Sequence, residues 1–414
     1  MKAEVITVGS ELLFGTFDNT NLLKICRELE ARGVEVAFAT TVGDDEKAIA
    51  GCISAAIART DAVVITGGLG PTHDDVTREA LAAATGRELE FRPELEADLR
   101  RFFESRDRQM NEMNLIQAYV PEGSEPIPNP VGTAPGILLE HEGVPVFALP
   151  GVPAEMEDML MRRVVPELAE RSGGNVFASR ILRAIGRGES DLASMISPIV
   201  KVCQDCGEPS VTILASRGEV AIHLRAGGAD RAAALAKIEP VEADLREALG
   251  SLVYGQDDST LQSVVSAMAQ ERGLTLAVVE SFTGGALASR IVAVPGASTV
   301  LRAGYVTYAI EAKVSEVGVP QETIDRYGAV SDQTARAMAS GARERSGADI
   351  GLSTTGEAGP NPGEEPVGTM FIGLAWDGGS LARKFVAAGA REDIREWGSR
   401  AALDTFRRWM LEEA

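Results

Sequence analysis

Short apolar runs alternate with longer segments of helical spacing in two separate parts of this sequence. Near the start, the runs Ala3 to Gly9 and Asp61 to Thr66 are each followed by a segment with helical spacing. The same rhythm returns in the last third, where the run Leu274 to Val279 precedes a helical segment. Such alternation predicts α/β domains in which a mainly parallel sheet is covered by helices.

The length of the chain bears on its domain organisation. One hydrophobic core rarely serves 414 residues, so two or three domains are expected. The patterns predict an α/β domain at 1–170, a small α+β connecting domain at 171–252 and a second α/β domain at 253–414.

Charge and composition disfavour several classes of function. The formal net charge is −21 and no basic patch is evident, so nonspecific nucleic-acid binding is disfavoured. No apolar run approaches the roughly 18 residues of a membrane-spanning helix. The first residues lack a signal-peptide pattern and the four cysteines are too few for a disulfide framework, so we expect a cytoplasmic protein. Cys203-Gln-Asp-Cys206 has zinc or redox spacing, but no second ligand pair follows, so we expect a structural role.

The segment Thr66-Gly-Gly-Leu-Gly-Pro-Thr-His-Asp-Asp75 joins glycines and acids directly after an apolar run. At the end of a parallel strand, glycines let backbone amides approach a phosphate, and the following helix N-terminus adds positive potential. Asp74 and Asp75 could hold a divalent cation that bridges to that phosphate. Alternatively, the glycines form a tight turn and Asp75 caps the helix.

Ser281 ends the apolar run of the last domain. The amides of Thr283, Gly284 and Gly285 follow it at the start of the next predicted helix and could stabilise an oxyanion. One such donor is typically worth ~3 kcal/mol of barrier. Alternatively, Ser281 is a helix N-cap and the glycines allow close packing.

A serine nucleophile in this domain needs an unusual base. No histidine follows His223 and no cysteine follows Cys206, which leaves lysine or tyrosine. Tyr308 stands at a predicted strand end, and Lys313 follows about one helical turn later. Burial would lower the lysine pKa toward 7. Without that role, Lys313 is an ordinary surface lysine.

A second glycine-rich element, Ser353 to Gly363, suits a nucleotide. Arg391 and Arg395 could pair with the phosphate of that nucleotide. Either arginine could equally lie on a solvated helix.

Three separated motifs of the first domain resemble the CinA (competence/damage-inducible protein A) family. They are Gly67-Gly-Leu-Gly-Pro-Thr-x-Asp-Asp-x-Thr77, Asp18-Asn-Thr-Asn21 and Pro150-Gly-Val-Pro-x-Glu155. The resemblance implies a doubly wound, molybdopterin-binding-like domain and a metal-dependent pyrophosphatase that splits ADP-ribose into AMP and ribose 5-phosphate. It makes Asp74 and Asp75 candidates for binding an ion of the cobalt or magnesium class. The substrate-binding residues expected in this domain are Gly67, Gly68, Gly70, Thr72, Asp18, Asn21 and Glu155. A KH-like fold is implied for the connecting domain.

The last domain resembles the PncC family of nicotinamide-nucleotide amidohydrolases, which forms the C-terminal domain of CinA. The matching segments are Glu280-Ser-x-Thr-Gly-Gly285, Gly304-x-Val-x-Tyr308 with Lys313, Tyr327-Gly-Ala-Val-Ser331, Gly356-x-Ala-Gly-Pro360 and Pro366-Val-Gly-Thr369. The resemblance implies a three-layer α/β domain that hydrolyses nicotinamide mononucleotide to nicotinate mononucleotide and ammonia without a cofactor. Carried over, Ser281 attacks the carboxamide, Lys313 takes its proton, and Tyr308 orients or relays. The substrate-binding residues expected here are Thr283, Gly284, Gly285, Gly356, Gly359, Arg391 and Arg395.

Some positions depart from the family pattern, namely Phe282, Ala309-Ile310, Glu357 and Ala390. Glu357 adds a negative charge near a phosphorylated ligand. The sequence thus predicts a bifunctional nucleotide-salvage enzyme with small nucleotides as ligands, and the resemblance suggests a homodimer. Two alternatives stay open. Only one half is active and the other is a ligand-binding regulator, or the chain is an accessory protein in DNA uptake or repair that acts through a protein partner.

Overall fold

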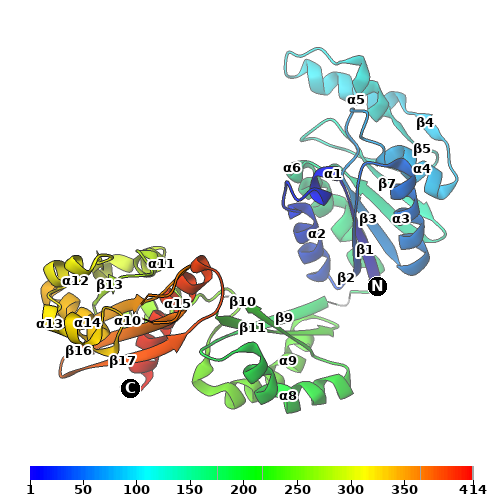
Figure 1. The fold of residues 1–414 in the computed structure, drawn as a ribbon. Helices are drawn as coiled ribbons and strands as arrows, with labels where there is room; N and C mark the ends of the chain where they lie inside the picture. Colours follow the sequence, from blue (N-terminus) through cyan, green and yellow to red (C-terminus); the bar gives the residue numbers. More distant parts are fainter. Residues whose placement is uncertain (175, 217, 364, 413–414) are drawn as a thin grey trace. The chain divides into compact units, whose positions relative to one another are not determined.

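The computed structural model describes residues 1–174, 176–216, 218–363 and 365–412. Of the predicted domains, the connecting domain includes positions 175 and 217 and the last domain includes 364, 413 and 414, all outside the described residues. The chain forms two compact units, one of 1–178 with 226–237 and the other of 179–225 with 238–414. Figure 1 labels most of their helices and strands.

The first unit is built on a six-stranded sheet in the order β2-β1-β3-β8-β7-β6. The first four of these strands run parallel, and β7 and β6 are antiparallel to their neighbours. The strands are β1 (Lys2–Val8), β2 (Glu35–Val42), β3 (Ala62–Thr66), β6 (Glu125–Ile127), β7 (Gly136–His141) and β8 (Val144–Leu149), with β4 (Leu89–Phe91) and β5 (Tyr119–Pro121) forming a separate pair.

Helices cover both faces of this sheet, because its central strands are apolar on both sides. One core cluster joins the sheet to α3 (Glu46–Arg59), α4 (Thr77–Thr85) and α5 (Pro93–Glu104). The other joins it to α2 (Thr20–Glu30), α6 (Pro153–Met159) and α7 (Val165–Arg171). The remaining elements are α1 (Ser10–Leu13), a 3-10 segment (Glu112–Ala118) and a π-helical segment (Leu160–Val164). The predicted doubly wound arrangement with a mainly parallel sheet is confirmed.

The segment between the two larger sheets forms a four-stranded sheet in the order β10-β11-β9-β12. β10 pairs antiparallel with β11, and β12 pairs antiparallel with β9. The elements are β9 (Val176–Ile185), α8 (Glu189–Cys206), β10 (Ser210–Ser216), β11 (Glu219–Gly228), α9 (Arg231–Leu249), a 3-10 turn (Gly250–Leu252) and β12 (Val253–Gln256). This is the small α+β fold that the sequence predicts.

The last part of the chain is a three-layer α/β domain around the sheet β14-β13-β15-β16-β17. β13 runs parallel to both of its neighbours, whereas β16 and β17 form an antiparallel hairpin at the edge. The strands are β13 (Leu276–Glu280), β14 (Leu301–Val306), β15 (Ile350–Gly356), β16 (Thr369–Trp376) and β17 (Gly379–Val386).

Helices from both sides bury this sheet. One core cluster holds α10 (Leu261–Glu271), α11 (Ala286–Val292) and α15 (Arg391–Glu412) against it, and the other holds α12 (Ile310–Val317), α13 (Gln321–Tyr327) and α14 (Asp332–Ser346). A 3-10 turn (Ala297–Thr299) precedes β14. Within the described part of the chain, none of the helices combines the length and apolarity needed to span a membrane.

Two helical glycines should respond oppositely to alanine. Gly51 in α3 has no atom within 4 Å of an added Cβ, so Gly51→Ala should stabilise the protein by about 0.5–1 kcal/mol through helix propensity. A Cβ at Gly341 in α14 would overlap the carbonyl oxygen of Val317, so Gly341→Ala should destabilise it by about 1–3 kcal/mol. Differential scanning calorimetry of both variants measures the two shifts, and equal shifts would contradict the close packing of α14.

Candidate active sites

Ser281 and Lys313 lie in contact in the C-terminal domain. The Lys313 amine is 3.1 Å from the Ser281 hydroxyl oxygen and 2.9 Å from the Thr307 carbonyl oxygen, which it donates to. Lys313 is only 2% exposed, so it is not a surface lysine. Ser281 directly follows strand β13, which is fully buried. The buried strand restricts where the Ser281 hydroxyl can lie.

The environment of the Lys313 amine favours its neutral form. Burial lowers the pKa of this amine from its ordinary value of 10.5. Among the described residues, no carboxylate forms an ion pair with it. A neutral amine at this distance can accept the proton of the Ser281 hydroxyl, which is the geometry that a general base requires.

Glu280 and Arg395 hold the turn that carries Ser281. The Glu280 carboxylate is 1% exposed and accepts hydrogen bonds from the amides of Gly285, Leu287 and Ala288 at 2.8–3.0 Å. Arg395 donates from Nη2 to the Thr283 carbonyl at 3.0 Å. Arg395 therefore contacts the turn itself, which sequence reasoning did not anticipate.

Two of the amides expected to face an oxyanion are engaged inside the protein. The Gly284 amide donates to the Ser281 carbonyl at 3.1 Å and the Gly285 amide donates to Glu280. In the described residues, the amides of Phe282 and Thr283 have no such acceptor, so they are the donors left for an oxyanion. The N-cap alternative for Ser281 is wrong, because α11 begins after Gly285.

Tyr308 and Arg391 meet at the exposed rim of this site. Tyr308 is 62% exposed, and its hydroxyl accepts a hydrogen bond from Arg391 Nη2 at 2.8 Å. Arg391 also donates to the Gly359 carbonyl. Tyr308 approaches Lys313 through its backbone carbonyl, 3.5 Å from the amine. Gly356, at the end of β15, packs against β16 with no room for a Cβ.

In the first unit, the glycine loop after β3 lines a cavity of about 390 Å³. The Thr77 hydroxyl donates to the Gly67 carbonyl at 2.8 Å, and the Thr77 amide donates to the Gly68 carbonyl at 3.1 Å. Within the described residues, the backbone amides of Gly68, Leu69 and Gly70 donate no hydrogen bond. Backbone amides free to bind are what a phosphate site needs.

Asp74 and Asp75 also line this cavity. One oxygen of each carboxylate lies within hydrogen-bond distance of the Thr72 hydroxyl, at 2.6 Å for Asp75. The Thr72 hydroxyl lowers the pKa of Asp74. The described residues contain no group of three or more His, Cys, Asp or Glu placed to hold a metal. Two carboxylates fit a hard cation such as Mg²⁺, which takes its other ligands from water and substrate phosphates.

The other expected residues of this domain lie around the same sheet edge. Asn21 donates to the Gly151 carbonyl at 2.8 Å, and together with Asp18 it lines a second cavity of about 240 Å³. Glu155 lines the glycine-loop cavity and accepts from Asn129 at 2.6 Å. Sequence reasoning missed further lining residues that come from distant segments. These are Asp44, Gln117 and Thr133.

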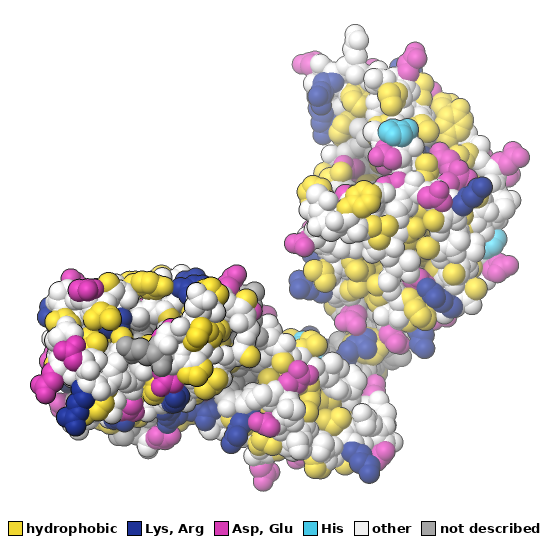
Figure 2. Space-filling model, in the orientation of Figure 1, with side chains coloured by type: hydrophobic (Ala, Val, Ile, Leu, Met, Phe, Trp, Pro, Cys, Tyr) yellow, Lys and Arg dark blue, Asp and Glu magenta, His cyan; other side chains and the backbone are white. Residues whose placement is uncertain are grey.

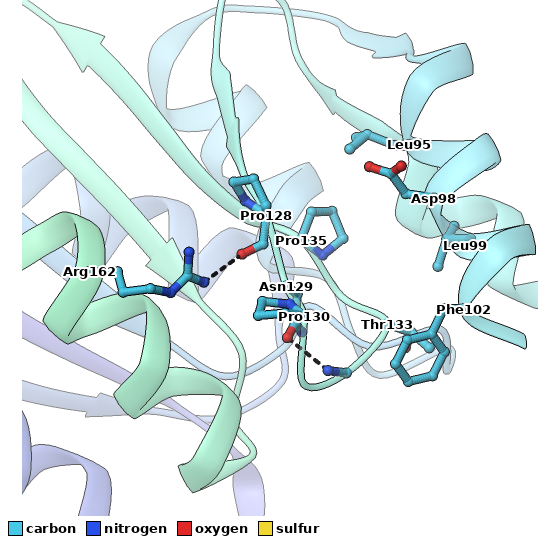
Figure 3. A pocket seen from close by; sticks show the side chains of 11 residues that line it. Leu95, Asp98, Leu99, Phe102, Pro128, Asn129, Pro130, Thr133, Pro135 and Arg162 are labelled. Atoms are coloured by element: carbon cyan, nitrogen blue, oxygen red, sulfur yellow. Dashed lines mark hydrogen bonds between the residues drawn. The ribbon is translucent and has the colours of Figure 1, made fainter. Parts of the chain in front are cut away.

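A third cavity, of about 230 Å³, lies between α5 and the proline-rich segment 128–135 (Figure 3). Leu95, Leu99 and Phe102 supply its apolar wall. Arg162 donates to the Pro128 carbonyl at 3.1 Å. Thr133 lines this cavity and the glycine-loop cavity, so one turn of the chain borders both.

Three family models match the chain and define its class. They are a "Probable molybdopterin binding domain" at 4–170, a "Damage-inducible protein CinA KH domain" at 179–255 and a "CinA C-terminal domain" at 258–410. The chain is therefore a protein in which a KH-type module joins a molybdopterin-binding-type domain to a CinA C-terminal domain.

Full-length relatives narrow this class to one family. A "CinA-like protein" of Frankia casuarinae is 45% identical over 99% of this chain and 96% of its own length. A "Putative competence-damage inducible protein" of Symbiobacterium thermophilum is 42% identical over 99% of both chains, and one of Caldicellulosiruptor saccharolyticus is 41% identical over 99% of this chain and 100% of its own. The chain belongs to the CinA family.

Replacing Glu280 by glutamine should loosen the turn that carries Ser281. Glutamine offers one acceptor oxygen and one NH₂ donor, so it cannot serve three amides, and Glu280→Gln should destabilise the domain by about 2–4 kcal/mol. Calorimetric unfolding measures this loss. Glu271→Gln, at an exposed position of α10, is the matched control and should leave the midpoint unchanged. Equal unfolding midpoints for the two variants would show that Glu280 does not stabilise the turn.

Proposed function

We propose that this CinA-family chain is a bifunctional nucleotide hydrolase. Its C-terminal domain would hydrolyse the carboxamide of nicotinamide mononucleotide, and its N-terminal domain would split ADP-ribose into AMP and ribose 5-phosphate. The single observation that carries the first activity is the contact between the Ser281 hydroxyl and the buried Lys313 amine.

The amidase reaction would follow from the position of these two groups. Ser281 Oγ attacks the carboxamide carbon while its proton passes to Lys313 Nζ, and the amides of Phe282 and Thr283 receive the developing oxyanion. Lys313 then gives the proton to the departing nitrogen, which leaves as ammonia. Water hydrolyses the resulting acyl-serine ester, with the Lys313 amine again accepting a proton. Arg391, held at the rim by Gly359, would bind the nucleotide phosphate.

Ammonia release from nicotinamide mononucleotide tests the nucleophile. Ser281→Ala should lower the rate by about 10⁴-fold or more, because the attacking oxygen is lost. Ser289→Ala, at an exposed position of α11, is the matched control and should keep the activity. Folded wild-type protein that releases no ammonia would reduce this domain to a binding module.

The pH dependence of this reaction tests the base. Burial lowers the pKa of Lys313 from 10.5, and only the neutral amine can accept the serine proton. The value of kcat/KM should therefore be low where the amine is protonated and rise with pH, with the midpoint of the rise below pH 10.5. Lys313→Arg keeps a protonated group throughout, so it should lose about 10³-fold in rate and show no such rise. A wild-type profile that falls as pH rises would exclude Lys313 as the base.

For the N-terminal activity, the glycine loop supplies the phosphate contacts and Asp74 and Asp75 are the candidates to hold a metal. A bound divalent ion of the magnesium or cobalt class would neutralise charge on the diphosphate. The amides of Gly68, Leu69 and Gly70 would bind and orient the phosphate oxygens within the cavity.

Release of AMP from ADP-ribose tests the metal residues. Asp74→Asn and Asp75→Asn should each lower the rate by about 10²-fold or more, and a chelator should abolish it. Asp61→Asn, which lies before β3 at the opposite end of that strand, is the control. Both metal-site variants should still release ammonia from nicotinamide mononucleotide, because the two activities use separate residues. AMP release that survives chelation would refute the metal assignment.

A further inference from the structure

Arg78 is a buried arginine whose partners are all backbone carbonyls. It is the second residue of α4, and its side chain is 2% exposed. Nη1 donates to the Leu69 carbonyl at 2.6 Å, and Nη2 donates to the carbonyls of Gly70 and Asp75 at 3.1 and 3.2 Å. In the described residues, its Nε has no hydrogen-bond partner and no carboxylate forms an ion pair with it.

These contacts complete a row of occupied carbonyls on one side of the glycine loop. Thr77 binds the carbonyls of Gly67 and Gly68, and Arg78 binds those of Leu69 and Gly70. In a trans peptide, the N–H points away from the C=O of the same unit. The amides that follow the first three carbonyls therefore point away from α4. They are the unoccupied amides of Gly68, Leu69 and Gly70.

The charge around the glycine-loop cavity makes this arginine unusual. Among the described residues that line the cavity, there is no lysine and no arginine. The carboxylates among them are those of Glu11, Asp44, Asp74, Asp75 and Glu155. A phosphate would be repelled by these acids, so a positive charge behind the loop matters for its binding.

Burial of Arg78 is costly for the protein alone. Taking a guanidinium out of water without an ion-paired carboxylate costs free energy, even when carbonyls accept its hydrogens. Burial lowers the pKa of Arg78, and the charges of Glu79 and Asp75 offset this shift only in part. A dianion bound on the other side of the loop would offset part of this cost.

We propose that Arg78 is a positioning residue for a diphosphate ligand: it fixes the loop with three amides facing the cavity, and it supplies the counter-charge behind them. The inference rests on the proposed N-terminal pyrophosphatase activity, and it names the residue on which phosphate affinity depends.

Binding of inorganic pyrophosphate to the full chain, titrated by calorimetry in chelator, tests this without the metal. Arg78→Gln removes the charge and most of the carbonyl contacts, so it should weaken binding by about tenfold or more. Arg78→Lys keeps the charge but not the planar fork, so it should weaken binding by about threefold or more. The KM for ADP-ribose, measured with magnesium, should rise by similar factors, with a smaller change in kcat.

Arg87→Gln is the matched control. Arg87 follows α4 and, as far as the described residues go, likewise donates to carbonyls only, those of Glu122 and Glu140, at 2.6 and 2.8 Å. It should keep the wild-type affinity for pyrophosphate even where it lowers the melting temperature. If Arg78 served only the stability of the domain, Arg78→Gln would also keep the wild-type affinity for pyrophosphate.

The outcomes separate this inference from the proposed function. Folded Arg78→Gln that binds pyrophosphate within twofold of wild type overturns the inference, and Arg78→Lys decides the matter if the glutamine variant does not fold. Wild-type protein that binds pyrophosphate in an Arg78-dependent way but does not cleave ADP-ribose overturns the activity alone. Wild-type protein that binds no pyrophosphate overturns the inference, whatever its activity.

Discussion

The parallel pairing of β13 with both of its neighbours determines the geometry of the C-terminal site. Its last residue, Glu280, pairs with Val306 on one side and Thr354 on the other. The same ladder continues past the strand end, where the Ser281 amide donates to Thr354 and the Thr307 amide donates to Glu280. The register thus places Ser281 beside the Thr307 carbonyl that holds the Lys313 amine. In parallel sheets covered by helices on both faces, ligand sites usually lie where the strands end.

The same constraint acts in the first unit. The Gly67 amide donates to the Leu149 carbonyl, and the Gly9 amide donates to the Val42 carbonyl, so the loops after adjacent strands converge on one edge. Residues from distant segments therefore surround one cavity. The two proposed activities differ in chemistry, but their sites are built in the same way. In each site, a polar loop follows a buried strand. The backbone of this loop is held by side chains in the first turn of the next helix in the first unit, and by a carboxylate that binds the first amides of the next helix in the C-terminal domain.

Much of this could be predicted from the sequence, because the signals are local. The apolar runs predicted the sheets, and the absence of histidine and cysteine from the last domain left lysine or tyrosine as the base for a serine nucleophile. The occupation of the Gly285 amide by the Glu280 carboxylate, and of the Gly284 amide by the Ser281 carbonyl, could not be predicted, because both contacts depend on how the turn folds. Arg78 was missed for a similar reason: its pattern is that of any helical arginine. The polar strand β17 was also missed. Its residues lack an apolar run, and it forms a strand because its backbone pairs with β16.

Phe282, an unusual residue beside the nucleophile, links that turn to the C-terminal helix. Its ring is buried with Met370 and Ile394, and it fills the space that a side chain at Gly398 would occupy. Arg395 of the same helix binds the turn at the Thr283 carbonyl. Local opening of α15 would release the ring and the carbonyl together, so α15 and the Ser281 turn should open as one unit in hydrogen exchange. Ser281 can then be only as well ordered as a helix more than a hundred positions further along the polypeptide.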